Sequence, residues 1–263
     1  MRLFFALSNW NNKAELVENQ INNILFAYPY ATNRFLKGLD DYVNEVKNIN
    51  MLVDSGAFSA WTLRKEIDRE KYLNFAKEMT KRYRNKVNSF NIVNLDKIPG
   101  DFGRKPTNIE RENSAQIGLD NFHYFLKNGI KTIPVFHQHE DIKWLKLMEK
   151  ETDYIGISPA NDCSTKNRIK WLDKVYSYLR DRVKTHSFGG VSKSILERYP
   201  LYSGDSSSWA TYNRWGRGNL VKTKIKPLGK DALSYMTGKE IKTAKKLGEY
   251  ITKLWLTRGV KWS

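Results

Sequence analysis

The sequence predicts an α/β protein built as one (β/α)₈ TIM-type barrel. Short apolar runs alternate along the chain with longer amphipathic stretches, which is typical of a parallel sheet with helices outside it. Eight such runs fall within 263 residues, a length that commonly holds one barrel domain. No GxGxxG or GxxxxGK[ST] motif follows any run, so a doubly wound open sheet is the less favoured alternative.

The elements are expected in a regular order. Apolar residues with helical spacing lie at 35–46, 72–83, 117–126, 172–179 and 241–255, and each set predicts one buried helix face. The strands are expected at residues 3–7, 50–53, 87–95, 131–136, 154–157, 184–188, 201–204 and 220–225. The whole chain, 1–263, is expected to form a single domain.

The charge is strongly positive. Lys and Arg number 45 against 28 Asp and Glu, which gives a formal charge of +17 and favours a polyanionic partner. Much of the excess lies in the segment 211–263, and a concentrated patch is what phosphate contacts require. The alternative is a basic enzyme whose lysines are merely solvated.

Cysteine usage and hydropathy narrow the class further. Cys163 is alone, so no disulfide within the chain and no cysteine-rich zinc site is expected. His137 and His139 could suggest a metal pair, but the chain has four histidines and no nearby cysteine, so neither metal nor cofactor is expected. No apolar run approaches membrane-spanning length, which predicts a cytoplasmic protein with no membrane partner.

Polar residues follow the expected strands, where barrel enzymes place their catalytic groups. Asp54, Asp96 and Asp205 each come at the end of a strand. Each has a structural alternative, because an Asp after a strand is often a helix N-cap or a turn residue. Two carboxylates facing a sugar C1′ could make and break an N-glycosidic bond, one as nucleophile and the other as acid and base.

The strand-end motifs, in this order, resemble those of the tRNA-guanine transglycosylase superfamily. The similarity is greatest to the compact, phage-type DNA 7-deazaguanine transglycosylases. It runs from about Asn50 to Trp209 and rests on six short segments. These segments are DSGAF (54–58), NLDKIP (94–99), FHQH (136–139), YIGIS (154–158), SFGG (187–190) and SGDSSS (203–208).

The resemblance implies a role for each site residue. Asp205 would be the nucleophile that bonds to C1′, and Asp54 the general acid and base. The base-binding residues would be Asp96, Gln138, Gly156, Phe58 and Phe188, of which the two phenylalanines would stack on the base. Strand 131–136 leads into FHQHED rather than the family's QGG-like turn, which leaves the role of Gln138 open.

The implied function is exchange of guanine in DNA for a 7-deazaguanine base, through a covalent aspartyl-sugar intermediate. The zinc subdomain of the tRNA enzymes needs cysteines that this chain lacks, which favours DNA over tRNA as the partner. Base exchange on tRNA, a base-releasing N-glycosidase or nucleoside hydrolase, and a non-enzymatic nucleic-acid-binding barrel remain alternatives. DNA is expected to contact Trp209, Arg214, Arg217, Lys222 and Lys224, where aromatic and cationic residues interleave.

Overall fold

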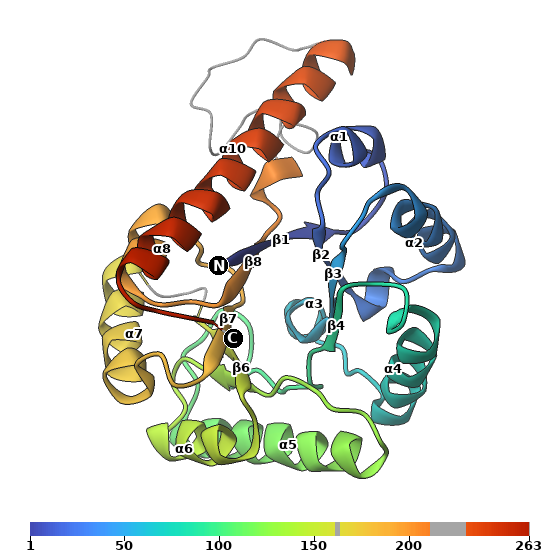
Figure 1. Cartoon of the computed structure of the whole chain (residues 1–263). Helices are drawn as coiled ribbons and strands as arrows, with labels where there is room; N and C mark the ends of the chain where they lie inside the picture. The colour runs from blue at the N-terminus through green and yellow to red at the C-terminus, as the bar shows by residue number, and fades with distance from the viewer. Residues whose placement is uncertain (161–163, 211–229, 263) are drawn as a thin grey trace.

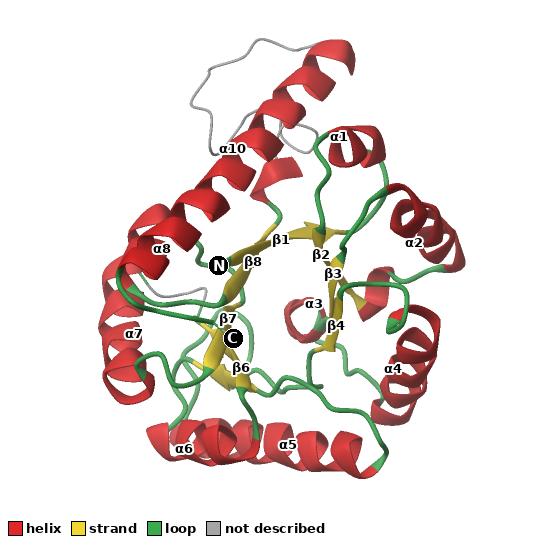
Figure 2. Ribbon diagram, in the orientation of Figure 1, coloured by secondary structure: helices red, strands yellow, loops and turns green. Residues whose placement is uncertain are grey.

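Eight parallel strands curl into a barrel with helices around the outside (Figures 1 and 2). The computed structural model describes residues 1–160, 164–210 and 230–262. The predicted fold class, a single-domain TIM-type barrel, is confirmed. The strands are β1 (Arg2–Leu7), β2 (Asn23–Ala27), β3 (Asn50–Asp54), β4 (Ser89–Ile92), β5 (Val135–His137), β6 (Tyr154–Ser158), β7 (Lys184–Ser187) and β8 (Ser203–Ser206).

The barrel closes unevenly. The strand order is β4-β3-β2-β1-β8-β7-β6-β5, so the first and last strands of the chain pair at the centre of the sheet. Its two edges, β4 and β5, meet through a single bridge between Val93 and Ile133. The edges therefore form a seam with far less backbone pairing than the other strand junctions.

Helices cover the outer surface of the sheet (Figure 2). Several begin at a side-chain cap: Asp68 accepts the Lys71 N–H, and Thr107 forms a capping box with Glu110. None of the described helices is long and apolar enough to cross a bilayer. They are α1 (Lys13–Glu18), η1 (Tyr28–Tyr30), α2 (Asn33–Glu45), α3 (Ala57–Thr62), α4 (Arg69–Tyr83), α5 (Asn108–Lys127), α6 (Ile142–Glu151), α7 (Thr165–Leu179), α8 (Lys193–Arg198), η2 (Ser208–Ala210) and α10 (Lys230–Thr257).

The core has an inner and an outer part. Two clusters fill the space between strands and helices, and a third fills the barrel interior. The interior cluster includes Phe4, Leu25 and Leu52, one from each of three successive strands, because alternate residues of a strand face the same side. This apolar plug separates the two ends of the barrel, and each end carries its own cavity.

The main error in the predicted elements is the missing β2. This strand follows β1 after only the six-residue helix α1, so the expected alternation with a long amphipathic helix is broken there. The strand expected at 220–225 lies outside the described residues. The strand expected at 131–136 begins later, at Val135, because Pro134 has no N–H for the ladder. On α5, Ile117 and Leu126 are exposed rather than buried.

Candidate active site

Three carboxyl groups line one cavity at the carboxyl ends of the strands. Asp54 ends β3, Asp96 follows β4 and Asp205 lies in β8, and all three border a cavity of about 600 Å³. Phe58 and Phe188 also line it, so its walls are partly aromatic. No Lys or Arg is among the described lining residues, and the cavity is therefore acidic.

Asp54 is the most perturbed of these groups. Burial, followed by the negative charges of Asp96 and Asp205, raises its pKa to about 7. The Gly56 backbone N–H donates to its Oδ2 at 3.1 Å and partly opposes this shift. Gly56 has φ +80°, and a Cβ there would lie 2.4 Å from Pro29 Cδ, so only glycine fits. Near neutral pH, the neutral and ionised forms of Asp54 are both populated.

Asp96 is held by two partners. The His137 Nε2 lies 2.9 Å from its Oδ2, and the Ser55 hydroxyl donates to its Oδ1 at 3.1 Å. Burial lowers the pKa of His137, but Asp96 and the nearby Glu140 raise it by more, so its pKa lies above the ordinary value. This contact favours the protonated form of His137 and fixes the Asp96 carboxyl in place.

Asp205 is connected to a buried chain of polar groups. Its Oδ1 accepts the Gly189 backbone N–H at 3.1 Å and lies 3.5 Å from the His186 Nε2. The other imidazole nitrogen, Nδ1, is 2.7 Å from the Ser203 hydroxyl, which in turn is 2.5 Å from the Tyr154 hydroxyl. His186 and Ser203 are fully buried, so this chain runs through the barrel interior from the acidic cavity towards the opposite end.

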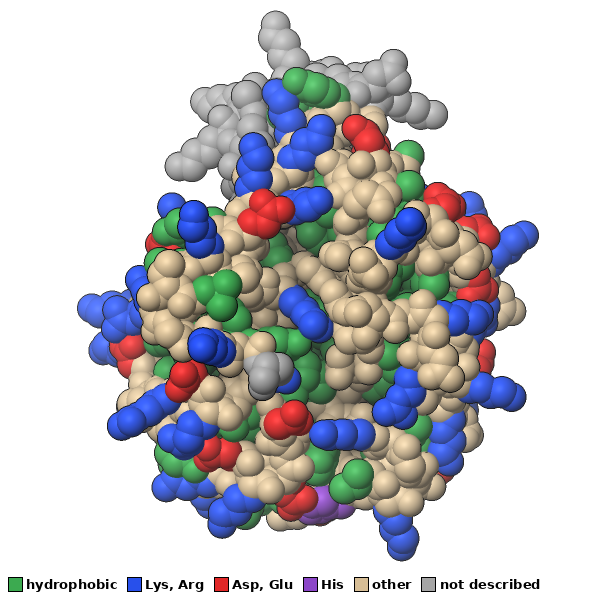
Figure 3. All heavy atoms as spheres, in the orientation of Figure 1, with side chains coloured by type: hydrophobic (Ala, Val, Ile, Leu, Met, Phe, Trp, Pro, Cys, Tyr) green, Lys and Arg blue, Asp and Glu red, His purple; other side chains and the backbone are tan. Residues whose placement is uncertain are grey.

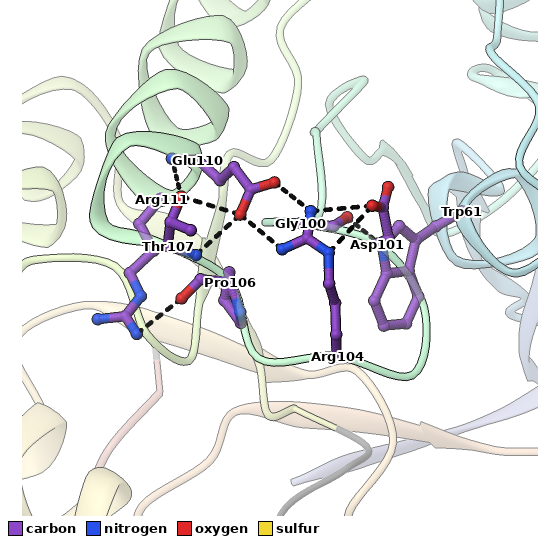
Figure 4. Close-up of polar contacts among 8 residues, drawn as sticks. All are labelled: Trp61, Gly100, Asp101, Arg104, Pro106, Thr107, Glu110 and Arg111. Atoms are coloured by element: carbon purple, nitrogen blue, oxygen red, sulfur yellow. Dashed lines mark hydrogen bonds and ion pairs between the residues drawn. The ribbon is translucent and has the colours of Figure 1, made fainter.

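The loop after β4 forms one wall of the mouth and is tied down by Arg104. Its guanidinium bridges Asp101 within the loop and Glu110 at the start of α5 (Figure 4). The Trp61 indole N–H donates to the Gly100 carbonyl at 2.6 Å, and its ring packs edge-on against Phe102. A side pocket of about 200 Å³ lies beneath this loop and shares Phe58 with the acidic cavity.

The structure places the predicted site residues in two groups. Asp54, Asp96, Asp205, Phe58 and Phe188 converge on the acidic cavity. The remaining two, Gln138 and Gly156, do not line it.

Gln138 lines the adjoining side pocket, and Gly156 packs against Phe188. The Gln138 Oε1 accepts the Ala160 backbone N–H at 3.0 Å, so this oxygen is already engaged. A Cβ at Gly156 would lie 2.5 Å from Phe188 Cε2, which shows that the glycine makes room for the Phe188 ring. The Phe188 ring therefore lies directly over the α-carbon of Gly156.

The expected nucleic-acid contacts receive no support from the described residues. Trp209 is buried and packs against Phe5, with ring centroids 5.8 Å apart, so it cannot stack on an exposed base. The other four, Arg214, Arg217, Lys222 and Lys224, lie outside the described residues.

Sequence reasoning missed the two histidines behind the carboxylates. In a continuous strand His137 and His139 would share a face, but β5 ends at His137 and His139 has φ +94° in the following turn. Strand alternation therefore does not relate them. His186 and Asp205 lie on neighbouring paired strands, and the pairing of His186 with Ser203 brings His186 beside Asp205. Among the described residues, no three His, Cys, Asp or Glu side chains converge as a metal site would need.

Comparisons with known proteins show the fold alone. No family model matches the chain, and no curated protein matches it. A designed, cube-shaped, highly porous protein cage is 10% identical, with a TM-score of 0.50 over 98% of this chain and 76% of that one. D-Psicose 3-epimerase from Clostridium cellulolyticum H10 is 9% identical, with a TM-score of 0.49 over 94% and 99%. A 4-hydroxy-2-oxoglutarate aldolase/2-deydro-3-deoxyphosphogluconate aldolase from TTHB1 is 12% identical, with a TM-score of 0.47 over 94% of both.

These findings correct the expected family. No family model and no curated protein matches the chain, so no sequence match supports the guanine transglycosylase superfamily. Three further predictions are wrong for the same reason: guanine exchange in DNA or tRNA, the base-releasing alternative and the phage origin.

Proposed function

We propose that this chain is an enzyme that moves protons next to the carbonyl group of a small, neutral, polar substrate. Asp54 would act as the acid and Asp205 as the base. The observation that carries the proposal is the convergence of three carboxyl groups on one cavity, with the pKa of Asp54 raised to about 7. Two carboxyl groups whose environments differ can divide acid and base roles at one pH.

The charge of the cavity selects the substrate. Its described lining has three carboxyl groups and no Lys or Arg, so a phosphate or carboxylate on the substrate would be repelled. A lysine that could form a Schiff base is missing from the same lining residues. A neutral molecule with a carbonyl and hydroxyl groups fits this environment, with its apolar face against Phe58 or Phe188.

The proposed reaction proceeds in two balanced steps. The Asp205 carboxylate takes the proton from the carbon next to the carbonyl, and the C–H electron pair forms a carbon–carbon double bond. The carbonyl electrons move to oxygen, which receives the Asp54 proton, and an enol results. Asp205 then gives its proton to the former carbonyl carbon, while the hydroxyl on the neighbouring carbon returns a proton to Asp54 and becomes the new carbonyl. The product is an isomer of the substrate, and both carboxyl groups regain their starting forms.

Asp96 supports this chemistry without touching the reacting atoms. Its negative charge raises the pKa of Asp54, and its contact with His137 keeps it in place. Without this charge, Asp54 would lose its proton more readily and would be a poorer donor at neutral pH. Asp96 is therefore proposed as a positioning residue.

Solvent exchange tests the proposal directly. Dihydroxyacetone and D-fructose would be incubated with the protein in D₂O, and the signals of protons next to the carbonyl followed by ¹H NMR. We expect these signals to decay with the native protein and to persist with Asp54→Asn and with Asp205→Asn. Pyruvate, an anionic carbonyl compound, should not exchange.

A matched variant controls for effects on folding. Asp173→Asn removes a carboxyl on α7 that pairs with Arg198 and does not line the acidic cavity, and this variant should exchange as fast as the native protein. Exchange that survives both Asp54→Asn and Asp205→Asn would overturn the assigned roles. The absence of exchange with either neutral probe would remove the support for enolisation of hydroxyketones.

A further inference from the structure

A second and larger cavity lies at the opposite end of the barrel. It has a volume of about 750 Å³ and is lined by Arg2 and Lys184, the first residues of β1 and β7. The lining also includes Ile92 and Ile133 on either side of the β4–β5 seam, where the strands are least closely paired. Figure 3 shows this end of the molecule, with Lys and Arg side chains distributed around hydrophobic side chains near its middle.

The charge of this cavity is opposite to that of the acidic cavity. Its described lining contains a single acidic residue, Asp153, which is paired with Lys131 at 3.2 Å. Five cationic side chains converge on it from separate parts of the chain. They are Arg2, Arg84, Lys131, Lys184 and Lys261.

Two of these cations are fixed without a carboxylate partner. The Arg2 guanidinium lies 5.2 Å from the centroid of the Tyr202 ring, and the Lys184 ammonium lies 5.3 Å from the same centroid. The Arg2 guanidinium also donates to the Ser89 hydroxyl at 3.1 Å. Within the described residues, no carboxylate lies within ion-pair distance of either group. The described acidic residue of this lining, Asp153, is paired with Lys131 and also interacts with the charge of Lys184, so one carboxylate is shared among the cations of this cavity and their positive charge is only partly balanced.

We propose that this basic cavity binds a small molecule carrying two or more phosphate groups. Arg2 and Lys184 would supply the fixed contacts, and Lys261 and Arg84 would add charge at the rim. Charge-assisted hydrogen bonds to phosphate are among the strongest polar contacts in proteins, and Arg matches phosphate geometry with paired donors. Trp262, edge-on to Tyr202 at 6.5 Å, provides an aromatic wall for a ring attached to the phosphates.

The recessed shape favours a small molecule over a nucleic-acid backbone. The cavity lies at the end of the barrel axis, between the strand ends and the C-terminal residues Lys261 and Trp262. A phosphate chain with one ring fits a volume of this size, within the usual range of ligand sites. The inference depends on residues at the opposite end from Asp54 and Asp205, and it stands independently of the proposed function.

Calorimetric titration with inorganic pyrophosphate and with ATP tests the site, on the full chain at low and moderate salt. We expect binding that weakens as salt rises. Lys184→Gln and Arg2→Gln should each lower the affinity by about tenfold or more, since a hydrogen bond to a charged group contributes that much. Lys184→Arg, which keeps the charge, should retain binding.

The control is Lys71→Gln, an exposed lysine at the start of α4 that does not line the cavity, and it should bind as the native protein does. Circular dichroism confirms that each variant is folded. Equal affinity in native protein, Lys184→Gln and Arg2→Gln would overturn the site, as would no binding of either probe at millimolar concentration. Binding of a DNA oligonucleotide but of neither small probe, lost in Lys184→Gln, would replace the proposal with a nucleic-acid surface.

Discussion

The His186 imidazole lies between the candidate base Asp205 and the buried hydroxyl of Ser203. Its Nε2 lies 3.5 Å from the Asp205 Oδ1, and its Nδ1 lies 2.7 Å from the Ser203 Oγ. The ring also packs edge-on against Phe188, with centroids 4.5 Å apart. Because the side chain is fully buried, its orientation is set by these three neighbours and in turn limits where the Asp205 carboxyl can point.

The first prediction follows from the contact between His186 and Asp205. His186→Asn removes the ring and frees the Asp205 carboxyl to rotate, so the proton exchange of dihydroxyacetone should slow by on the order of 10²-fold, with a changed pH profile. The measurement is the exchange rate in D₂O between pH 5 and 9. Thr185→Val is the matched control, because Thr185 contacts Tyr176 on α7 at 2.8 Å and should leave the profile unchanged. An unaltered rate and profile in His186→Asn would show that the imidazole does not position Asp205.

The second prediction concerns stability and pH. The pKa of Asp54 rises from its ordinary 3.8 to about 7 on folding, so the folded state favours the protonated form. Ionisation therefore costs stability, which falls as pH rises from about 4 through 7. Asp54→Asn cannot ionise and should be more stable than the native protein at pH 8 by about 2–4 kcal/mol, with little difference at pH 3.

Urea denaturation at several pH values measures this difference. Asp173→Asn is the control of opposite sign, because Tyr199 and Arg198 lower the pKa of Asp173 and its loss should not stabilise the protein at any pH. A pH-independent difference between Asp54→Asn and the native protein would contradict the raised pKa.

The third prediction tests the fit between Gly156 and Phe188. In Gly156→Ala the new methyl group would lie 2.5 Å from Phe188 Cε2 and 3.1 Å from Val135 Cγ2, so the ring must move into the acidic cavity. We expect a loss of about 1–3 kcal/mol in unfolding free energy, typical of overpacking. Adding Phe188→Leu should recover part of it.

Gly118→Ala in α5 is the control for this pair. A Cβ there has no heavy atom within 4 Å, and alanine is the better helix former, so stability should stay the same or rise. If Gly156→Ala proved as stable as Gly118→Ala, Phe188 would not be confined by Gly156.

The fourth prediction concerns the loop that Arg104 holds. Arg104→Ala removes the bridge between Asp101 and Glu110 and should make the segment 97–106 more sensitive to limited proteolysis. The midpoint of thermal unfolding should change little, since the bridge is at the surface. Lys105→Ala, the exposed neighbour, should be cut no faster than the native protein. Equal cleavage of the two variants would mean that other contacts, such as the one between Trp61 and Gly100, hold the loop.

The sequence identified the carboxyl groups of the site but not their partners. Asp54, Asp96 and Asp205 follow apolar runs, and the barrel rule alone brings such strand ends together. The roles of His137 and His186 depend on which strands are neighbours and on where each strand ends, and neither is encoded locally. Similarly, the sequence alone makes Gly156 a possible ligand contact. The structure shows that this glycine makes room for the Phe188 ring.

The same limit explains the mistaken family assignment. Segments such as DSGAF and SGDSSS are short, and their residues suit several kinds of chemistry at a strand end. What decides among them is the surroundings of each group, as with Gln138, whose oxygen is occupied by the Ala160 N–H. Missing β2 had little effect on the predicted site. It changed the number of strands before Asp54, but Asp54 still lies at the carboxyl end of its own strand.

Because a single bridge joins β4 to β5, the barrel is less firmly closed at this seam than at its other strand junctions. Val93 and Val135, on its two sides, border the acidic cavity, and Ile92 and Ile133 border the basic one. Separation of β4 from β5 at the Val93–Ile133 bridge would therefore change the width of both cavities. The two cavities thus share one strand junction as part of their walls.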